Sequence, residues 1–145
     1  MIKDRTGRTT IVQPEAVAGS DVAANTEFSH TVPAGETWHL KAVSVALVQG
    51  ATQTPQPILR ISVGSVVVYE GYGCTTAQAI STTCRYTWAA GLPLTGLVGA
   101  TTEVRAQAPL LADLVLPAGS VIESSTIGKG ANSNYGAPAF LVEKL

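Results

Sequence analysis

Charged side chains are scarce in this 145-residue chain. Lysine, arginine, aspartate and glutamate together make up 13% of the residues, about half the usual share, whereas the apolar share of 46% is ordinary. The formal net charge is −1, so the chain has no broad basic field, and we expect neither nucleic acid nor a membrane as a partner. A surface so poor in charge indicates that part of it is buried against other protein.

Long apolar runs are missing as well. No stretch approaches the ~18 uninterrupted apolar residues of a membrane span, and residues 1–7 lack the apolar core of a secretory signal. We therefore expect a protein that is made in the cytoplasm and stays there unless it leaves as part of an assembly.

Residues that carry catalysis are few. His30 and His39 both lie in apolar-rich runs, and no Gly-x-Ser-x-Gly motif is present. Neither the histidines nor the cysteines show a metal-ligand spacing such as His-x-His or Cys-x-x-Cys, and the ten acidic residues are scattered. We therefore predict no enzyme, no metal and no cofactor. A small β-sandwich hydrolase would need a carboxylate pair in a cleft, which nothing in the sequence indicates.

Two cysteines, Cys74 and Cys84, flank a loop rich in threonine, alanine and serine. A disulfide between them would close a loop of about 11 residues and stabilise the fold by about 3 kcal/mol in the chain-entropy model. Reduced, buried thiols are the usual state in a cytosolic protein. Both interpretations stay open from the sequence.

Short alternating runs separated by glycine and proline dominate the chain. They predict eight to ten short strands and no helix, and therefore an all-β fold: a single-domain β-sandwich or barrel, with the jelly roll among the candidates. We place an extended N-terminal arm at residues 1–20 and the sandwich domain at residues 21–145. The clearest runs are 26–32, 36–48, 58–63, 65–70, 85–88, 103–107, 120–127 and 139–144.

The longest run, 36–48, alternates so that Trp38 and Leu40 share a face with Ala42, while Val43 and Val45 occupy the other. Because its second half is apolar on both faces, we expect that half to be buried on both sides. The runs 58–63 and 65–70 on either side of Gly64 predict a hairpin.

Two Pro-Ala-Gly turns, at residues 33–35 and 117–119, each precede a predicted strand. They are either two similar turns in a turn-rich chain or the equivalent corners of a pseudo-symmetric sandwich. Four aromatic residues cluster around the cysteine loop and could form core, an interface or a carbohydrate platform. These aromatic residues are Tyr69, Tyr72, Tyr86 and Trp88.

The stretch 31–47, with its Val-Pro-Ala-Gly-Glu-Thr-Trp corner, and the stretch 114–122, with Leu-Pro-Ala-Gly, resemble small virion proteins of tailed phages. Together with the arm and the low charge, they are similar to head decoration (cement) proteins with a jelly-roll-like fold. The resemblance implies a homo-oligomer, a homotrimer rather than a homodimer, that binds the major capsid protein on the outer surface of the virion head. That family has no catalytic residues to transfer.

On this interpretation the arm contacts the capsid through Ile2, Lys3, Arg5 and Arg8. The charge-free stretch 42–59 would form core and subunit contacts. The main alternative is a tail-fibre or receptor-binding tip domain that recognises host glycan through residues 69–88.

Overall fold

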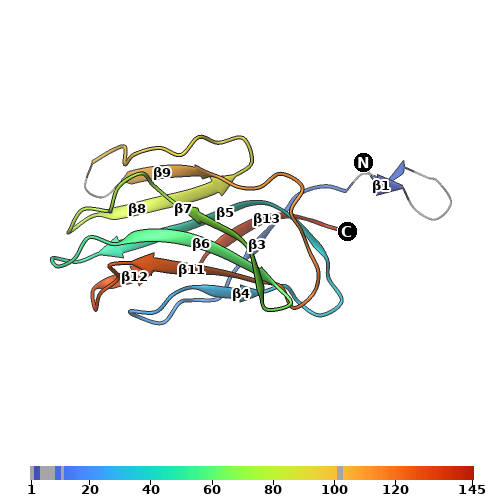
Figure 1. The fold of residues 1–145 in the computed structure, drawn as a ribbon, viewed down its shortest axis with the longest axis horizontal. Coiled ribbons are helices and arrows are strands. Elements are labelled where there is room, and N and C mark those ends of the chain that lie inside the picture. Colours follow the sequence, from blue (N-terminus) through green and yellow to red (C-terminus); the bar gives the residue numbers. More distant parts are fainter. Residues whose placement is uncertain (1, 4–8, 11, 101–102) are drawn as a thin grey trace.

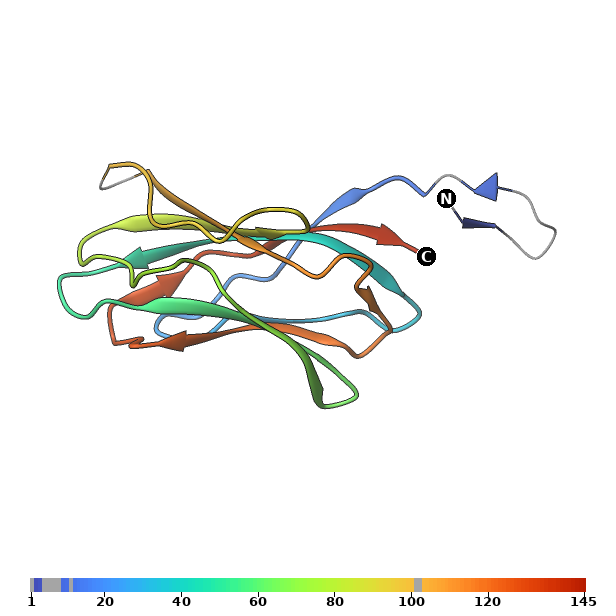
Figure 2. The ribbon, with the colours of Figure 1, turned by 45° about the horizontal axis from the view of Figure 1, so that its top comes forward.

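The structure, a computed structural model, describes residues 2–3, 9–10, 12–100 and 103–145. Within them two β-sheets pack face to face, which confirms the predicted all-β sandwich (Figures 1 and 2). The jelly-roll variant of that prediction stays a prediction. No helix long and apolar enough to cross a membrane occurs in the described part of the chain.

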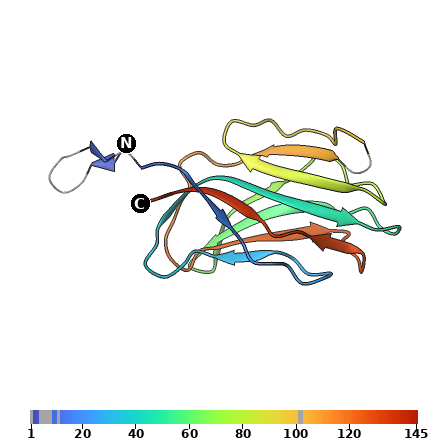
Figure 3. The same ribbon diagram turned by 180° about the vertical axis from the view of Figure 1, so that it is seen from behind.

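One sheet has seven strands (Figure 3). Its main path follows the order β3-β13-β5-β8-β9, and two short strands also pair with β5. The neighbours are antiparallel except for β8 and β9, which run parallel. The strands are β3 (Glu15–Ala18), β5 (Trp38–Gln49), β8 (Thr83–Ala89), β9 (Val104–Pro109), β10 (Val115–Leu116), β12 (Ser133–Tyr135) and β13 (Ala139–Lys144).

The second sheet has four strands in the order β4-β11-β6-β7, all antiparallel. These strands are β4 (Ser29–Thr31), β6 (Gln56–Val63), β7 (Val66–Tyr72) and β11 (Val121–Ile127). The β6–β7 hairpin is the predicted one, and its turn residues Gly64 and Ser65 have φ of 55° and 65°. Two consecutive positive φ values are the geometry of a type I′ hairpin turn, which matches the twist of the flanking strands.

The boundary of the predicted arm needs correction. Residues 15–18, which we assigned to the arm, form the edge strand β3 and pair in register with β13. The run Glu15-Ala16-Val17-Ala18 has little strand propensity of its own, and its partner lies more than a hundred residues away, so only tertiary pairing makes it a strand. Nearer the N-terminus, β1 (Ile2–Lys3) and β2 (Thr9–Thr10) form a short antiparallel ladder beyond one end of the sandwich (Figure 1).

Strand β5 does not keep one alternation from end to end. Trp38 and Leu40 are buried, and so are Val43 and Val45, although these two pairs have opposite parity. Two consecutive residues of β13 face Leu40 and Ala42 of β5. The residue of β5 between Leu40 and Ala42 is therefore unpaired and forms a β-bulge. The prediction that the second half is buried on both sides is therefore wrong, because the bulge turns the valines into the same core as Trp38.

The two Pro-Ala-Gly turns are equivalent corners. In each, the amide of the following residue donates to the proline carbonyl at 3.1 Å, and the glycine has a positive φ, 80° at Gly35 and 86° at Gly119. The first corner leads from β4 in the smaller sheet to β5 in the larger sheet. The second leads from β10, the partner of β5, to β11, the partner of β4. The corners join through Val32, whose amide donates to the Ser120 carbonyl at 2.8 Å.

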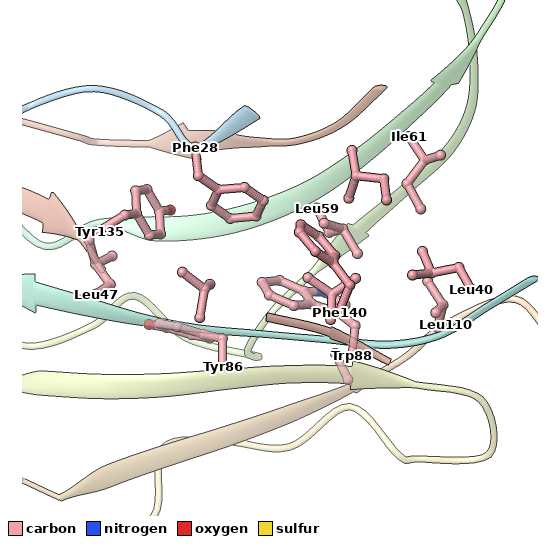
Figure 4. Close-up of a cluster of buried hydrophobic side chains, with 14 of the residues drawn as sticks. Phe28, Leu40, Leu47, Leu59, Ile61, Tyr86, Trp88, Leu110, Tyr135 and Phe140 are labelled. Carbon is pink, nitrogen blue, oxygen red and sulfur yellow. The ribbon is translucent and has the colours of Figure 1, made fainter. Parts of the chain in front are cut away.

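Large side chains from both sheets fill the space between the layers (Figure 4). Trp38, Tyr86, Trp88 and Phe140 are at most 1% exposed. Burial of a phenylalanine such as Phe140 contributes roughly 1.5–3 kcal/mol. A buried amide is also part of this core. Gln78 donates to the carbonyls of Leu47 and Thr82 at 2.9 and 3.0 Å and accepts the Tyr86 hydroxyl at 2.9 Å.

Candidate functional site

Both histidines have structural surroundings. The His30 ring lies against Trp38 and Phe140, with ring centroids 5.2 and 4.8 Å apart, and burial lowers the pKa of His30. His39 lies between two carboxylates, with Nδ1 3.4 Å from Glu143 and Nε2 3.8 Å from Asp113. In the described ranges neither histidine hydrogen-bonds to a serine, threonine or cysteine, and no three side chains of His, Cys, Asp or Glu gather as a metal site would require.

The two cysteines are both fully buried and are not bridged. Burial raises the pKa of the Cys84 thiol to about 12. A thiol with so high a pKa is protonated at neutral pH and is therefore a poor nucleophile. Cys74 and Cys84 thus behave as small core residues.

The aromatic cluster around the cysteine loop separates into two groups. Tyr86 and Trp88 are core residues with no exposed surface. The Tyr69 hydroxyl donates to the Pro109 carbonyl, and burial raises the pKa of Tyr69. Tyr72 is 46% exposed and is the one member of this cluster with a freely accessible ring. A carbohydrate platform built from all four rings is therefore absent from this region.

The outer faces of the two sheets differ in chemistry. Across the smaller sheet, the cross-strand register places Glu123 beside Arg60 and Arg60 beside Glu70. Arg60 Nε lies 2.7 Å from Glu70 Oε1, so this row of charges is paired on the protein surface. The paired charges solvate the middle of this sheet. At its edge, β7 exposes Val66, Val67, Val68 and Tyr72.

The outer face of the seven-stranded sheet consists largely of small uncharged residues. Figure 3 looks onto this side of the molecule. One row across the strands contains Ala16, Leu141, Ala42 and Ala89. Leu141 is 40% exposed at the centre of that row. We call this surface the small-residue face. Its residues are Ala16, Ala18, Ala42, Ser44, Ala46, Thr87, Ala89, Ala139 and Leu141.

Charges lie at the ends of the small-residue face rather than on it. At one end, Lys41 Nζ lies 3.4 Å from Glu143, and Lys144 Nζ lies 2.8 Å from Glu15 and 3.3 Å from Glu36. Glu15 and Glu36 raise the pKa of Lys144. The hydrogen bond from the Trp38 indole, followed by the contact with Lys144, lowers the pKa of Glu36. A charge-poor centre with a charged border resembles the core and rim of a protein interface.

At the other end the face continues into a groove of about 380 Å³. Parallel pairing of β8 and β9 places Arg85 directly beside Arg105 on its floor, and both side chains are exposed. Residues 92–98, which follow β8, form the outer wall, because Val98 bridges to Arg105 by two backbone hydrogen bonds. We call this the arginine groove. It is lined by Arg85, Thr87, Leu92, Thr95, Val98, Arg105, Ala106 and Gln107.

Of the predicted capsid contacts, Ile2 and Lys3 belong to β1, whereas Arg5 and Arg8 lie outside the described residues. Sequence reasoning missed the arginine groove. The alternation in 84–88 and 104–108 directs Arg85 and Arg105 away from the core, which was a usable signal for each residue alone. No local pattern indicated that the two strands are parallel neighbours.

Comparison with known proteins found no matching family model, no matching curated protein and no matching solved structure.

Proposed function

We propose that this chain is a structural virion protein, a decoration (cement) protein that binds the outer surface of a tailed-phage head and stabilises the shell. It binds the major capsid protein through the small-residue face and functions as a homotrimer. The proposal rests on the contrast between the two outer faces. One is crossed by paired charges, and the other is short of charge and continuous with two exposed arginines.

The position of the N-terminal residues supports the same partner. The chain leads from residues 12–14 directly into β3, and Ala16 and Ala18 of β3 belong to the small-residue face. An arm that precedes this strand starts at the border of the proposed interface. The glycan-binding alternative has less support, since Tyr86 and Trp88 are buried.

Electron microscopy of the encoding phage tests the location. We expect density for the sandwich on the outer surface of the head, with the seven-stranded sheet turned toward the shell. Density on the tail fibres would contradict the proposal.

Binding to heads that lack the protein tests the surface. Ala42→Glu places a charge at the centre of the small-residue face, and we expect at least tenfold weaker binding because that charge would be buried without a partner. Ser125→Glu on the outer face of the four-stranded sheet is the matched control and should bind normally. A truncation of residues 1–13, which spares β3, should also reduce binding.

Sedimentation and thermal unfolding of each variant separate loss of binding from loss of fold. We expect all three variants to remain folded homotrimers. If Ala42→Glu instead yields a folded monomer, the small-residue face joins copies of the chain and does not bind the shell. Full occupancy of heads by Ala42→Glu would exclude the face from shell binding.

A further inference from the structure

We infer that the arginine groove is a binding site for a carboxylate-bearing segment of a partner protein, held by Arg85 and Arg105. This inference rests on the proposed function in one respect only, that the partner is the protein on which the small-residue face docks. The groove itself is a property of this chain.

Two like charges placed side by side on neighbouring strands call for a counter-charge. Cross-strand neighbours of like charge repel each other and cost stability. Neither Arg85 nor Arg105 forms an ion pair with any carboxylate that the structure describes, whereas Arg60 and Lys144 do. Glu103 lines an adjacent hollow together with Arg85 and Arg105, but it forms no ion pair with either arginine among the described residues. A bound anion would supply the counter-charge that the described residues do not provide for the two arginines.

The donors point to a carboxylate. Each guanidinium presents a planar fork of N–H groups that matches the two oxygens of a carboxylate. Arg85 Nη1 donates to Ser44 Oγ at 3.1 Å, a bond that orients this fork while leaving its other donors free for a ligand. The backbone N–H of Gln107 donates to Thr95 Oγ1 at 3.2 Å, which fixes Thr95 in the wall of the groove.

The surroundings favour protein over polyanion. Leu92 and Val98 line the same groove, and Val98 is 67% exposed, so an apolar wall stands beside the charged floor. A peptide segment supplies both a carboxylate and aliphatic atoms. Nucleic acid would require a wider basic field than two arginines on a chain of net charge −1.

The experiment uses the full chain and a blocked hexaglutamate peptide as the probe, with hexaglutamine as the uncharged control peptide. We expect hexaglutamate to bind and to shift the resonances of Arg85 and Arg105, with affinity that falls as salt rises. Arg85→Gln and Arg105→Gln should each weaken binding about tenfold, the effect of losing a hydrogen bond to a charged group. Arg60→Gln, on the opposite outer face, is the matched control and should bind as the unchanged protein does.

Lysine variants test whether binding needs the planar guanidinium geometry or only a positive charge. Arg85→Lys and Arg105→Lys keep the charge but lose the two-pronged geometry, so we expect affinities between those of the unchanged protein and the glutamine variants. Equal binding of hexaglutamine would overturn the site, and so would absence of hexaglutamate binding or an unchanged affinity in Arg85→Gln and Arg105→Gln. A single-stranded oligonucleotide that binds the groove more tightly than hexaglutamate would overturn the class of ligand.

The two proposals fail separately. If phage heads bind the protein but hexaglutamate does not bind to it, the arginine groove is not a carboxylate site, and the proposed function is unaffected. If hexaglutamate binds through the arginines and heads do not bind the protein, the groove stands and the proposed function falls.

Discussion

At the scale of single residues, buried polar side chains are of two kinds, those that have a hydrogen-bond partner and those that lack one. Gln78 and Tyr86 satisfy each other in the core, and the Glu27 carboxylate accepts from the amide and hydroxyl of Thr126 at 2.8 and 2.9 Å. His30 is the exception within the described residues, because its buried Nε2 has no hydrogen-bond partner. An unpaired buried nitrogen costs stability, and more so when it is protonated.

That property of His30 predicts how stability depends on pH. Burial lowers the pKa of His30 below its ordinary value of 6.5, and the charge of Glu36 opposes this only in part. The unfolded chain therefore takes up a proton at a higher pH than the folded chain does. Stability is fully present above about pH 6.5 and falls as the pH drops from there to the folded pKa.

His30→Phe keeps an aromatic ring between Trp38 and Phe140 and removes the titration. We expect the free energy of unfolding of His30→Phe to lose less between pH 7 and pH 5 than that of the unchanged protein, as measured by chemical denaturation at each pH. His39→Gln is the matched control. Parallel pH curves for the unchanged protein and His30→Phe would contradict this assignment.

At the scale of elements, the two Pro-Ala-Gly corners perform the same task in opposite directions. Each passes the chain between sheets, and each depends on one glycine in the left-handed region. The Cβ of an alanine at Gly35 or at Gly119 would meet nothing within 4 Å. Any cost of that substitution therefore comes from the backbone conformation and not from a clash.

Gly35→Ala and Gly119→Ala should each lower the free energy of unfolding by about 1 kcal/mol, the cost of a left-handed conformation for an L-residue. Because the corners are equivalent, we expect the two values to agree. Gly136→Ala is the control, since Gly136 lacks a positive φ and has ordinary space around it. Unfolding in denaturant measures all three variants. A large cost at one corner alone would show that the corners are not equivalent.

At the scale of the whole molecule, the sandwich separates a closed core from one charge-paired and one charge-poor surface. The accessibility of the two cysteines tests whether the core is closed. Cys74 and Cys84 are buried and unbridged, so a reagent reaches them only when the molecule opens.

A thiol-reactive aromatic disulfide should therefore label both cysteines readily in denatured, unreduced protein, but in native protein only when the molecule opens. Labelling under native conditions should proceed at the rate of unfolding, and a reductant should leave the unfolding temperature unchanged. A denatured, unreduced sample with no reactive thiol would show that Cys74 and Cys84 form the disulfide that the sequence left open.

Local sequence patterns determined the class of fold. Alternation of period two, valine-rich runs and turn residues at near-regular spacing predicted β4–β9, β11 and β13, the β6–β7 hairpin and both Pro-Ala-Gly turns. These features depend on residues close together in the chain, and their physical causes are equally local. The scarcity of charge likewise indicated an interaction surface without saying where it lies.

Tertiary structure alone decided the details of the candidate site. The bulge in β5 changed which residues face outward, β3 became a strand only by pairing with β13, and the parallel pairing of β8 and β9 brought Arg85 beside Arg105. In each case the deciding contact joins strands whose pairing no local pattern specifies. Alternation along a strand determines on which face of the sheet a side chain lies, whereas the pairing of the strands determines which side chains are its neighbours.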